Sequence, residues 1–217
     1  MDATQELLRP GIMPLEANGS LVSKKPDTGA DTSILGKILL VMDLEMSGPR
    51  PRTHEVLDIG GIRAEISDGV PEAGSFGSRI LPLHIGTADR GALKVVGYSS
   101  KAWKDALPFE RAFEEFTKLG TGAVVAGWGI GHDMAFLSES YRRLGMDWPF
   151  APVAVDIQFV ARKILTKADV DRFNLGHVAD RLGIGRMGEH GALADAYATY
   201  DVLVELCARG LQPEQDS

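Results

Sequence analysis

Three groups of residues along the 217-residue chain have types and spacings that suit metal-dependent hydrolysis. Asp43 and Glu45 are two residues apart, Asp133 stands alone, and His190 precedes Asp195 by five residues. Carboxylate oxygens are ligands that Mg²⁺ and Mn²⁺ prefer, and four carboxylates can hold two such ions about 3.5–4 Å apart. One ion activates water and the other stabilises the leaving oxygen of a phosphodiester, while a histidine with a pKa near ~6.5 accepts the water's proton.

Each group also has an ordinary structural explanation. Asp43 and Glu45 suit the solvated end of a strand, Asp133 suits the N-cap of a helix, and His190 suits an exposed loop. Because five helical residues turn about 140° beyond one full turn, His190 and Asp195 do not share a helix face. We therefore expect the histidine on a glycine-flanked loop and Asp195 in the first turns of the following helix. The combination of the groups, rather than any one of them, favours a metal site.

The elements that must position these residues follow from the hydrophobic pattern. The continuous apolar run at residues 38–42 predicts a buried strand that ends at Asp43. Strands are predicted at residues 38–42, 56–66, 76–83, 123–126 and 153–156, and helices after Pro108 and at residues 134–144, 157–165, 175–182 and 191–208. The first three strands suggest an antiparallel meander. The predicted fold class is α/β, with a mixed five-stranded sheet and helices on both faces.

Composition and charge narrow the class of protein. Hydrophobic residues make up 44% of the chain and charged residues 24%, which is typical of a globular domain. No apolar run approaches the ~18–20 residues of a membrane span, no hydrophobic leader begins the chain, and the single Cys207 suits a reducing compartment. The expected location is therefore cytoplasmic, with no membrane partner. The net charge of −7 disfavours binding along a long duplex but not a small acidic metal site.

The N-terminal segment differs from the rest of the chain. Residues 1–36 contain no aromatic side chain and are rich in proline, glycine and small polar residues. Such a segment buries little apolar surface and is predicted to be a flexible arm, with a short helix at residues 5–9 docked on the domain or a partner as the alternative. The catalytic domain is predicted at residues 37–209, with a C-terminal tail at residues 210–217.

Three ordered motifs carry a resemblance to the DEDDh family of 3′→5′ exonucleases, which includes polymerase proofreading subunits, RNase T and oligoribonuclease. The first consists of residues 41–48 (VMDLEMSG) and 56–60 (VLDIG), the second of residues 124–127 (VVAG) and 132–137 (HDMAFL), and the third of residues 173–175 (FNL), 182–184 (LGI) and 190–196 (HGALADA). The resemblance covers about residues 37–206.

The resemblance implies an RNase H-like fold and release of nucleoside 5′-monophosphates from single-stranded 3′ ends of DNA or RNA, including short oligonucleotides. It implies two Mg²⁺ or Mn²⁺ ions, with Asp43, Glu45, Asp133 and Asp195 as their ligands, His190 as the general base and Met46 in contact with the terminal nucleotide. A homodimer or a polymerase partner is also compatible with the family. Arg50 and Arg52 follow the first motif, and they either contact a backbone phosphate or belong to a proline-rich surface turn.

The chain departs from the family pattern at three positions. Gly129 stands where the second motif usually has asparagine, His132 stands where it usually has an aromatic residue, and Asp58 occupies a position commonly held by glutamate. Because the predicted ligands remain, these departures bear on how the terminal nucleotide is positioned. They also motivate an alternative function, a non-catalytic nucleic-acid-binding or adaptor domain on the same fold.

Two further alternatives concern the site and the reaction. Tyr197 and Asp201 have the spacing of a tyrosine-containing sister group, but His190 and Asp195 have the better motif context, so we interpret Tyr197 as a packing residue. An RNase H-type endonuclease would make internal cuts in an RNA–DNA hybrid instead of shortening an end. The histidine of the third motif favours the exonuclease over this endonuclease.

Overall fold

The computed structural model describes residues 3–22, 38–66, 70–166, 168–185 and 191–210. Its central element is β2 (Ile38–Met46), which contains the apolar run that predicts a strand. Leu39 and Val41 are buried in one hydrophobic core, and Leu40 and Met42 are buried in another. Because side chains alternate across a strand, the two cores lie on opposite faces of the sheet. β2 is thus buried on both faces, which explains its continuously apolar sequence.

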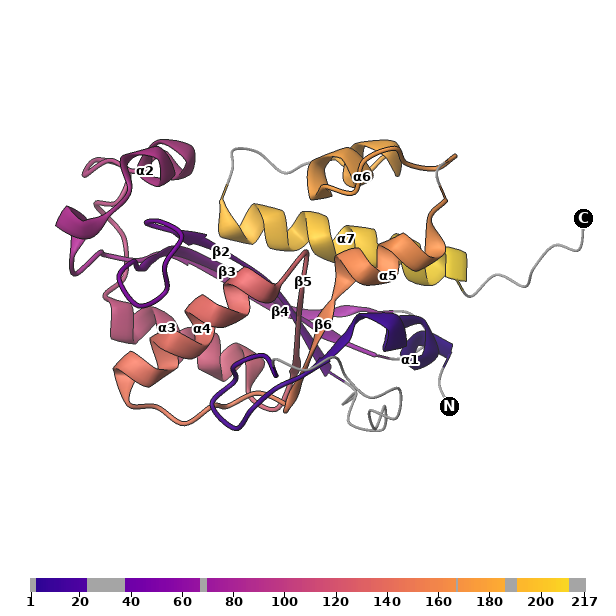
Figure 1. The fold of residues 1–217 in the computed structure, drawn as a ribbon, viewed down its shortest axis with the longest axis horizontal. Coiled ribbons are helices and arrows are strands. Elements are labelled where there is room, and N and C mark those ends of the chain that lie inside the picture. The colour runs from indigo at the N-terminus through magenta and orange to yellow at the C-terminus, as the bar shows by residue number, and fades with distance from the viewer. Residues whose placement is uncertain (1–2, 23–37, 67–69, 167, 186–190, 211–217) are drawn as a thin grey trace, which may run out of the picture.

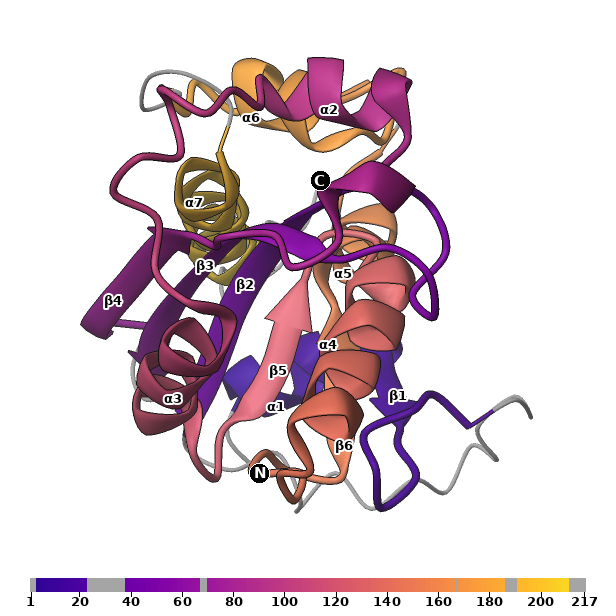
Figure 2. The same cartoon turned by 90° about the vertical axis from the view of Figure 1, so that its left-hand side faces the viewer.

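Within the described residues the sheet has six strands, in the order β1-β6-β5-β2-β3-β4. Figure 1 shows this sheet, and its strand order can be followed in Figure 2, where the molecule is turned by 90°. β3 (Val56–Glu65) and β4 (Glu72–Arg79) complete the predicted antiparallel meander with β2. β5 (Val124–Gly127) runs parallel to β2, and β6 (Val153–Asp156) runs parallel to β5. Because the three parallel strands end at the same edge, the residues that follow each of them are brought together there. The mixed α/β sheet is confirmed.

The prediction of five strands is wrong by one, because a strand precedes the predicted domain. β1 (Ile12–Pro14) pairs antiparallel with β6 at the end of the sheet. It follows α1 (Ala3–Leu8) and a 3₁₀ turn, Arg9–Gly11, and the Leu8 side chain is fully buried in the core beneath α7. Residues 3–22 are therefore packed on the domain, in agreement with the docked-helix alternative. Residues 23–36 of the predicted arm and residues 211–217 of the predicted tail lie outside the described residues.

Helices cover both faces of the sheet, as predicted (Figure 2). α3 (Phe109–Gly120) and α4 (Gly131–Leu144) pack on the core that contains Leu40, whereas α5 (Ile157–Ile164), α6 (Leu175–Arg181) and α7 (Ala192–Gly210) pack on the core that contains Leu39. One helix, α2 (Arg90–Val96), was not predicted; it is seven residues long and contains no fully buried residue. None of the described helices is long and apolar enough to cross a membrane.

Candidate metal centre

The first two acidic side chains are placed by the register of β2. Asp43 and Glu45 lie two and four residues after Val41, so their side chains point to the same face of the strand, the face that packs against α7. In the neighbouring strand β3, Gly60 lies opposite Asp43 and Asp58 lies opposite Glu45. The glycine leaves the space above Asp43 open on the α7 side. Both carboxylates are only partly exposed at the edge where the parallel strands end.

Asp195 is brought to these carboxylates by a close approach of α7 to the sheet. A Cβ atom on Gly60 would lie 2.2 Å from the backbone nitrogen of Leu193, and one on Gly77, its register partner in β4, would lie 2.7 Å from the Leu193 side chain. The first turn of α7 therefore packs directly on Gly60 and Gly77, which we call the two-glycine seat. A side chain at either position would prevent this close approach. In consequence, carboxylate oxygens of Asp43, Glu45 and Asp195 lie within 4.8 Å of one another.

Asp58 fixes the same end of α7 from the sheet. Its carboxylate accepts hydrogen bonds from the backbone N–H groups of Ala192, the first residue of α7, and of Ile59. The first N–H groups of a helix have no partner inside the helix, so a carboxylate at this point both satisfies them and complements the helix dipole. In the sequence, Asp58 is recognisable only as a departure from the family pattern. Its position opposite Glu45 makes it a support for Asp195, which only the tertiary structure reveals.

Asp133 approaches the site from α4, on the other side of β2. It lies in the first turn of that helix, and its carboxylate accepts hydrogen bonds from its own backbone N–H and from that of Leu44. It is therefore tied to the strand between Asp43 and Glu45. Its oxygens do not belong to the group that lies within 4.8 Å, but its charge raises the pKa of Asp43. The N-cap of α4 is Ile130, so Asp133 is not the cap residue that its sequence also suited.

Burial, and after it the charges of neighbouring carboxylates, raise the pKa values of Asp43, Glu45 and Asp133. Burial raises the pKa of Asp43 well above its usual range, and the charges of Asp133, Glu45 and Asp195 raise it further. Burial also raises the pKa of Glu45 to about 7, with contributions from Asp195 and Asp58. The pKa of Asp133 rises to about 7, again mainly because of burial. Such a cluster of like charges is costly unless a cation compensates it, and its oxygen-only donors fit a hard divalent ion.

Asp156 supports the same edge of the sheet from the end of β6. Its carboxylate accepts hydrogen bonds from the backbone N–H of Gly129, at 3.0 Å, and from that of Gln158, at 2.9 Å. It thereby caps α5 and also fixes the turn between β5 and α4. Gly129 has a φ of +61°, a left-handed conformation that favours glycine, so this departure from the family pattern matches a turn held by Asp156. Asp156 was not among the predicted site residues, although an aspartate between a short apolar strand and a helical pattern is a sequence signal for a helix N-cap.

Other predicted site residues are placed as follows. His132 is exposed in the first turn of α4 and packs edge-to-face on the Phe136 ring. Met46 ends β2 beside the acidic group and is half-buried. Arg50 and Arg52 are exposed on the loop that follows β2. His190 lies outside the described residues, directly before the glycine that precedes α7.

The tyrosine of the alternative assignment packs away from the acidic group. The Tyr197 hydroxyl lies 2.9 Å from both Glu72 Oε1 and Ser75 Oγ, on the edge strand β4. Burial raises the pKa of Asp201, and the charge of Glu72 adds to this rise. These contacts agree with the interpretation of Tyr197 as a packing residue.

Comparison with known proteins identifies relatives of the domain. The family model described as Exonuclease, of the RNase T type, matches residues 40–203. A putative bifunctional exonuclease/endonuclease protein from Mycobacterium tuberculosis is 24% identical over 82% of the chain, and a DNA polymerase III subunit epsilon from Aquifex aeolicus is 22% identical over 80%. The chain spans 28% of the first relative and 82% of the second. It also spans 12% of a DNA polymerase III of the PolC type from Thermotoga petrophila, at 23% identity.

Solved structures share the fold. Escherichia coli Exonuclease I in complex with a dT13 oligonucleotide superposes with a TM-score of 0.69 at 19% identity, over 80% of this chain and 41% of that one. An Exonuclease I from Methylocaldum szegediense gives a TM-score of 0.63 at 20% identity, over 82% of this chain and 41% of that one. At these identities the likeness supports the architecture, which is the RNase H-like arrangement that the motifs implied.

Proposed function

The chain belongs to the RNase T family of exonucleases, and from this premise we propose that it is a metal-dependent 3′→5′ exonuclease of the DEDDh type. It hydrolyses phosphodiester bonds at single-stranded 3′ ends of DNA or RNA and releases nucleoside 5′-monophosphates. The observation that carries the proposal is the group of Asp43, Glu45 and Asp195 oxygens within 4.8 Å, with Asp133 tied to the same strand.

The acidic residues act together as metal ligands in this proposal. Asp43, Glu45 and Asp195 hold the divalent ions, two Mg²⁺ or Mn²⁺, and Asp133 completes the ligand set from α4. When bound, these ions supply an activated water and stabilise the charge on the leaving oxygen. Burial and the charges of its acidic neighbours raise the pKa of Asp43, so a neighbouring cation stabilises its ionised form. Asp58 and the two-glycine seat hold Asp195 in place.

The substrate side of the proposal rests on residues that flank the acidic group. His190 takes the proton of the attacking water, as the third motif implies, because an imidazole is the side chain that accepts a proton near neutral pH. Met46 lies at the end of β2 and contacts the terminal nucleotide, and Arg50 and Arg52 contact backbone phosphates. Single-stranded oligonucleotides are the expected partners, since Exonuclease I has been solved with dT13 and dA16. A polymerase or dimer partner and the cytoplasmic location stay predictions.

A ladder assay tests the proposal. An oligonucleotide labelled at its 5′ end, in matched DNA and RNA versions, is incubated with the protein and Mg²⁺ or Mn²⁺. Stepwise shortening is expected, with loss of at least ~10³-fold in rate for Asp43→Ala and Asp195→Ala, since both remove a ligand. Asp201→Asn is the matched control on α7 and should shorten the substrate at the wild-type rate. Undiminished activity of both ligand variants, internal cuts in a hybrid, or binding of a 3′ end without turnover would contradict the proposal.

A further inference from the structure

The loop between β2 and β3, residues 47–55, is closed and internally packed; we call it the arginine loop. The Ser47 N–H donates to the Glu55 carbonyl at 2.8 Å, and the Glu55 N–H donates to Ser47 Oγ at 2.8 Å, so the ends of the loop are joined. His54 is buried inside, where its Nδ1 accepts the Arg50 N–H at 2.8 Å. A Cβ on Gly48 would lie 2.6 Å from the His54 ring, so the ring packs directly beneath this glycine.

The loop presents Arg50 and Arg52 to solvent without acidic partners. Both are exposed, and no ion pair joins either of them to a carboxylate in the described part of the chain. The nearby arginines of α4 differ, because Arg142 and Arg143 both pair with Glu139. Arg143 also donates to the Pro51 carbonyl at 2.6 Å, which fixes the loop against α4. The loop thus holds two exposed cationic side chains in a fixed position.

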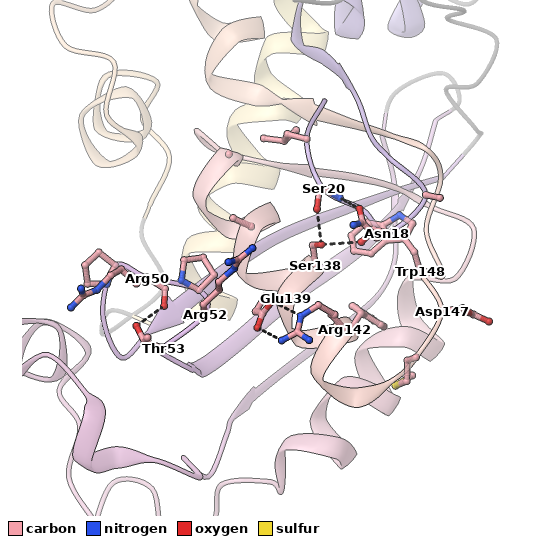
Figure 3. A pocket seen from close by; sticks show the side chains of 18 residues that line it. Asn18, Ser20, Arg50, Arg52, Thr53, Ser138, Glu139, Arg142, Asp147 and Trp148 are labelled. Carbon is pink, nitrogen blue, oxygen red and sulfur yellow. Dashed lines mark hydrogen bonds and ion pairs between the residues drawn. The ribbon is translucent and has the colours of Figure 1, made fainter. Parts of the chain in front are cut away.

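A cavity of about 1320 Å³ runs beside this loop, along one face of α4. Its floor consists of small residues spaced by helical turns, Gly131, Ala135 and Ser138, and Arg142 lies at its far end. Figure 3 shows Arg50 and Arg52 on one side of the cavity and Asn18, Ser20 and Trp148 on the other. We call this cavity the α4 groove. The arginine loop directly follows β2, the strand that carries Asp43 and Glu45, and α4 carries Asp133 in its first turn. The groove is therefore built on two of the elements that position the metal site.

The second wall of the groove comes from outside the segment that matches the family. Residues 15–21 form a turn closed by a bridge between Leu15 and Leu21, whereas the family match begins at residue 40. This turn is held against α4 and the segment beyond it. The Ser138 hydroxyl donates to the Asn18 carbonyl at 2.9 Å, and a Cβ on Gly19, whose φ is +82°, would lie 2.3 Å from the Trp148 ring. The turn is therefore seated on Trp148 and cannot be shifted without loss of these contacts.

We propose that the α4 groove binds the single-stranded part of a nucleic acid upstream of the 3′ end, with Arg50 and Arg52 on its backbone phosphates. The charge of the lining supports this occupant. Glu139 is paired with Arg142 and Arg143, and Asp147 is the other acidic residue of the lining. The three arginines of the lining, Arg50, Arg52 and Arg142, outnumber these two carboxylates, so the groove carries a net positive charge. The guanidinium group of arginine can bind phosphate oxygens through two parallel N–H donors. A groove with a wall on each side fits a single strand better than a duplex. The inference rests on the proposed function, because it assigns the path of that substrate.

Binding without hydrolysis tests the groove separately from catalysis. The probe is a 12-nucleotide single-stranded DNA with a 5′ fluorescein, titrated with protein in EDTA and followed by anisotropy. The Arg50→Ala/Arg52→Ala variant should bind at least tenfold more weakly. Its plot of log K against log salt should be shallower by about 1.4, because each phosphate contact on a single strand contributes about 0.7. Ala135→Trp, which fills the floor at an exposed helix position, should also weaken binding at least tenfold.

A matched control is Arg111→Ala on α3, which removes an exposed arginine that pairs with Glu114 and Glu115. It should bind within twofold of the wild type with an unchanged salt slope. The inference is overturned if the double variant also binds within twofold of the wild type, or if a 12-residue acidic peptide binds as tightly with the same arginine dependence. If the wild type shortens the substrate in the ladder assay but the double variant binds the probe as tightly as the wild type, the groove proposal is refuted and the proposed function is not. Absence of shortening by the wild type refutes the proposed function, while arginine-dependent binding in EDTA would still support the groove.

Discussion

The seat for α7 gives the sharpest test of how the metal site is built. In Gly60→Ala, the new Cβ would lie 2.2 Å from the Leu193 nitrogen, 2.3 Å from its Cα and 2.4 Å from the carbonyl carbon of Ala192. All three are backbone atoms, so no side chain can turn away, and ordinary contact begins at 3.4 Å. The first turn of α7 must therefore retreat by about 1 Å. Asp195, which lies in this same first turn, moves with it.

The expected result is a large loss of metal binding with a modest loss of stability. Overpacking of this kind costs about 1–3 kcal/mol of the free energy of unfolding, so the variant should remain folded. A 1 Å displacement of a catalytic group can reduce rate about 10²-fold. We expect Mn²⁺ affinity to fall at least tenfold, measured by isothermal titration calorimetry, and the shortening rate to fall about 10²-fold. Thermal unfolding followed by circular dichroism measures the stability of the same samples.

Gly61→Ala is the matched control, because it adds the same methyl group one residue along and on the opposite face of β3. Its Cβ would lie 2.7 Å from Phe116 Cε2 and 3.2 Å from Leu40 Cδ1, which are side-chain atoms in the other core. This variant should lose similar stability but keep wild-type Mn²⁺ affinity. Unchanged Mn²⁺ affinity in Gly60→Ala, or an equal loss of affinity in both variants, would refute the seat as the device that positions Asp195.

Three further predictions concern the charges of the site. Burial raises the pKa of Glu45 to about 7, so its ionised form destabilises the metal-free protein as pH rises from about 4 to 7. Glu45→Gln should therefore unfold in EDTA at pH 8 with a free energy about 1–2 kcal/mol higher, allowing for its partial exposure, and should match the wild type at pH 4. An unchanged free energy at pH 8 would contradict this. Protons compete with metal at Glu45 and Asp133, so Mn²⁺ affinity should fall at least tenfold from pH 8 to pH 6, and a flat calorimetric profile would contradict the cause. Asp58→Ala should lose Mn²⁺ affinity because Ala192 loses its acceptor, whereas Asp58→Asn should largely restore it; equal loss in both variants would mean that charge, not the hydrogen bond, matters.

The sequence predicted those parts of the site that follow from local pattern. An apolar run buried on both faces has few other interpretations, so β2 and the shared face of Asp43 and Glu45 were predictable. The amphipathic helices were predictable for the same reason, since α3 buries one stripe of Phe109, Phe113 and Phe116. Local pattern also placed Asp133 and Asp195 in the first turns of their helices, as the structure has them. His190 stays a prediction.

Tertiary contacts decided the parts that the sequence left open. β1 has three residues and ends in Pro14, so nothing in its sequence distinguishes a strand from an extended linker. Only its antiparallel pairing with β6 in the folded protein makes it a strand. Gly60 and Gly77 are neighbours only in the sheet register, and their use becomes visible only when Leu193 lies against both. The role of Asp58 has the same origin, because its partner, Ala192, is more than a hundred residues away.

The net charge of −7 conceals a separation of charges that suits an end-directed enzyme. Carboxylates gather where the parallel strands end, and burial together with the neighbouring negative charges raises the pKa values of Asp43 and Glu45 there. This edge therefore repels phosphate until divalent ions compensate its charge. On the loop that follows β2, Arg50 and Arg52 are exposed and form no ion pair with an acidic residue of the described segments. With only a few such cations, the protein gains little from each additional phosphate along a long duplex. Affinity should therefore saturate once a strand covers the arginine loop. A titration of 3-, 6- and 12-nucleotide single strands in EDTA measures this, and affinity that keeps rising well beyond the length of the groove would contradict it.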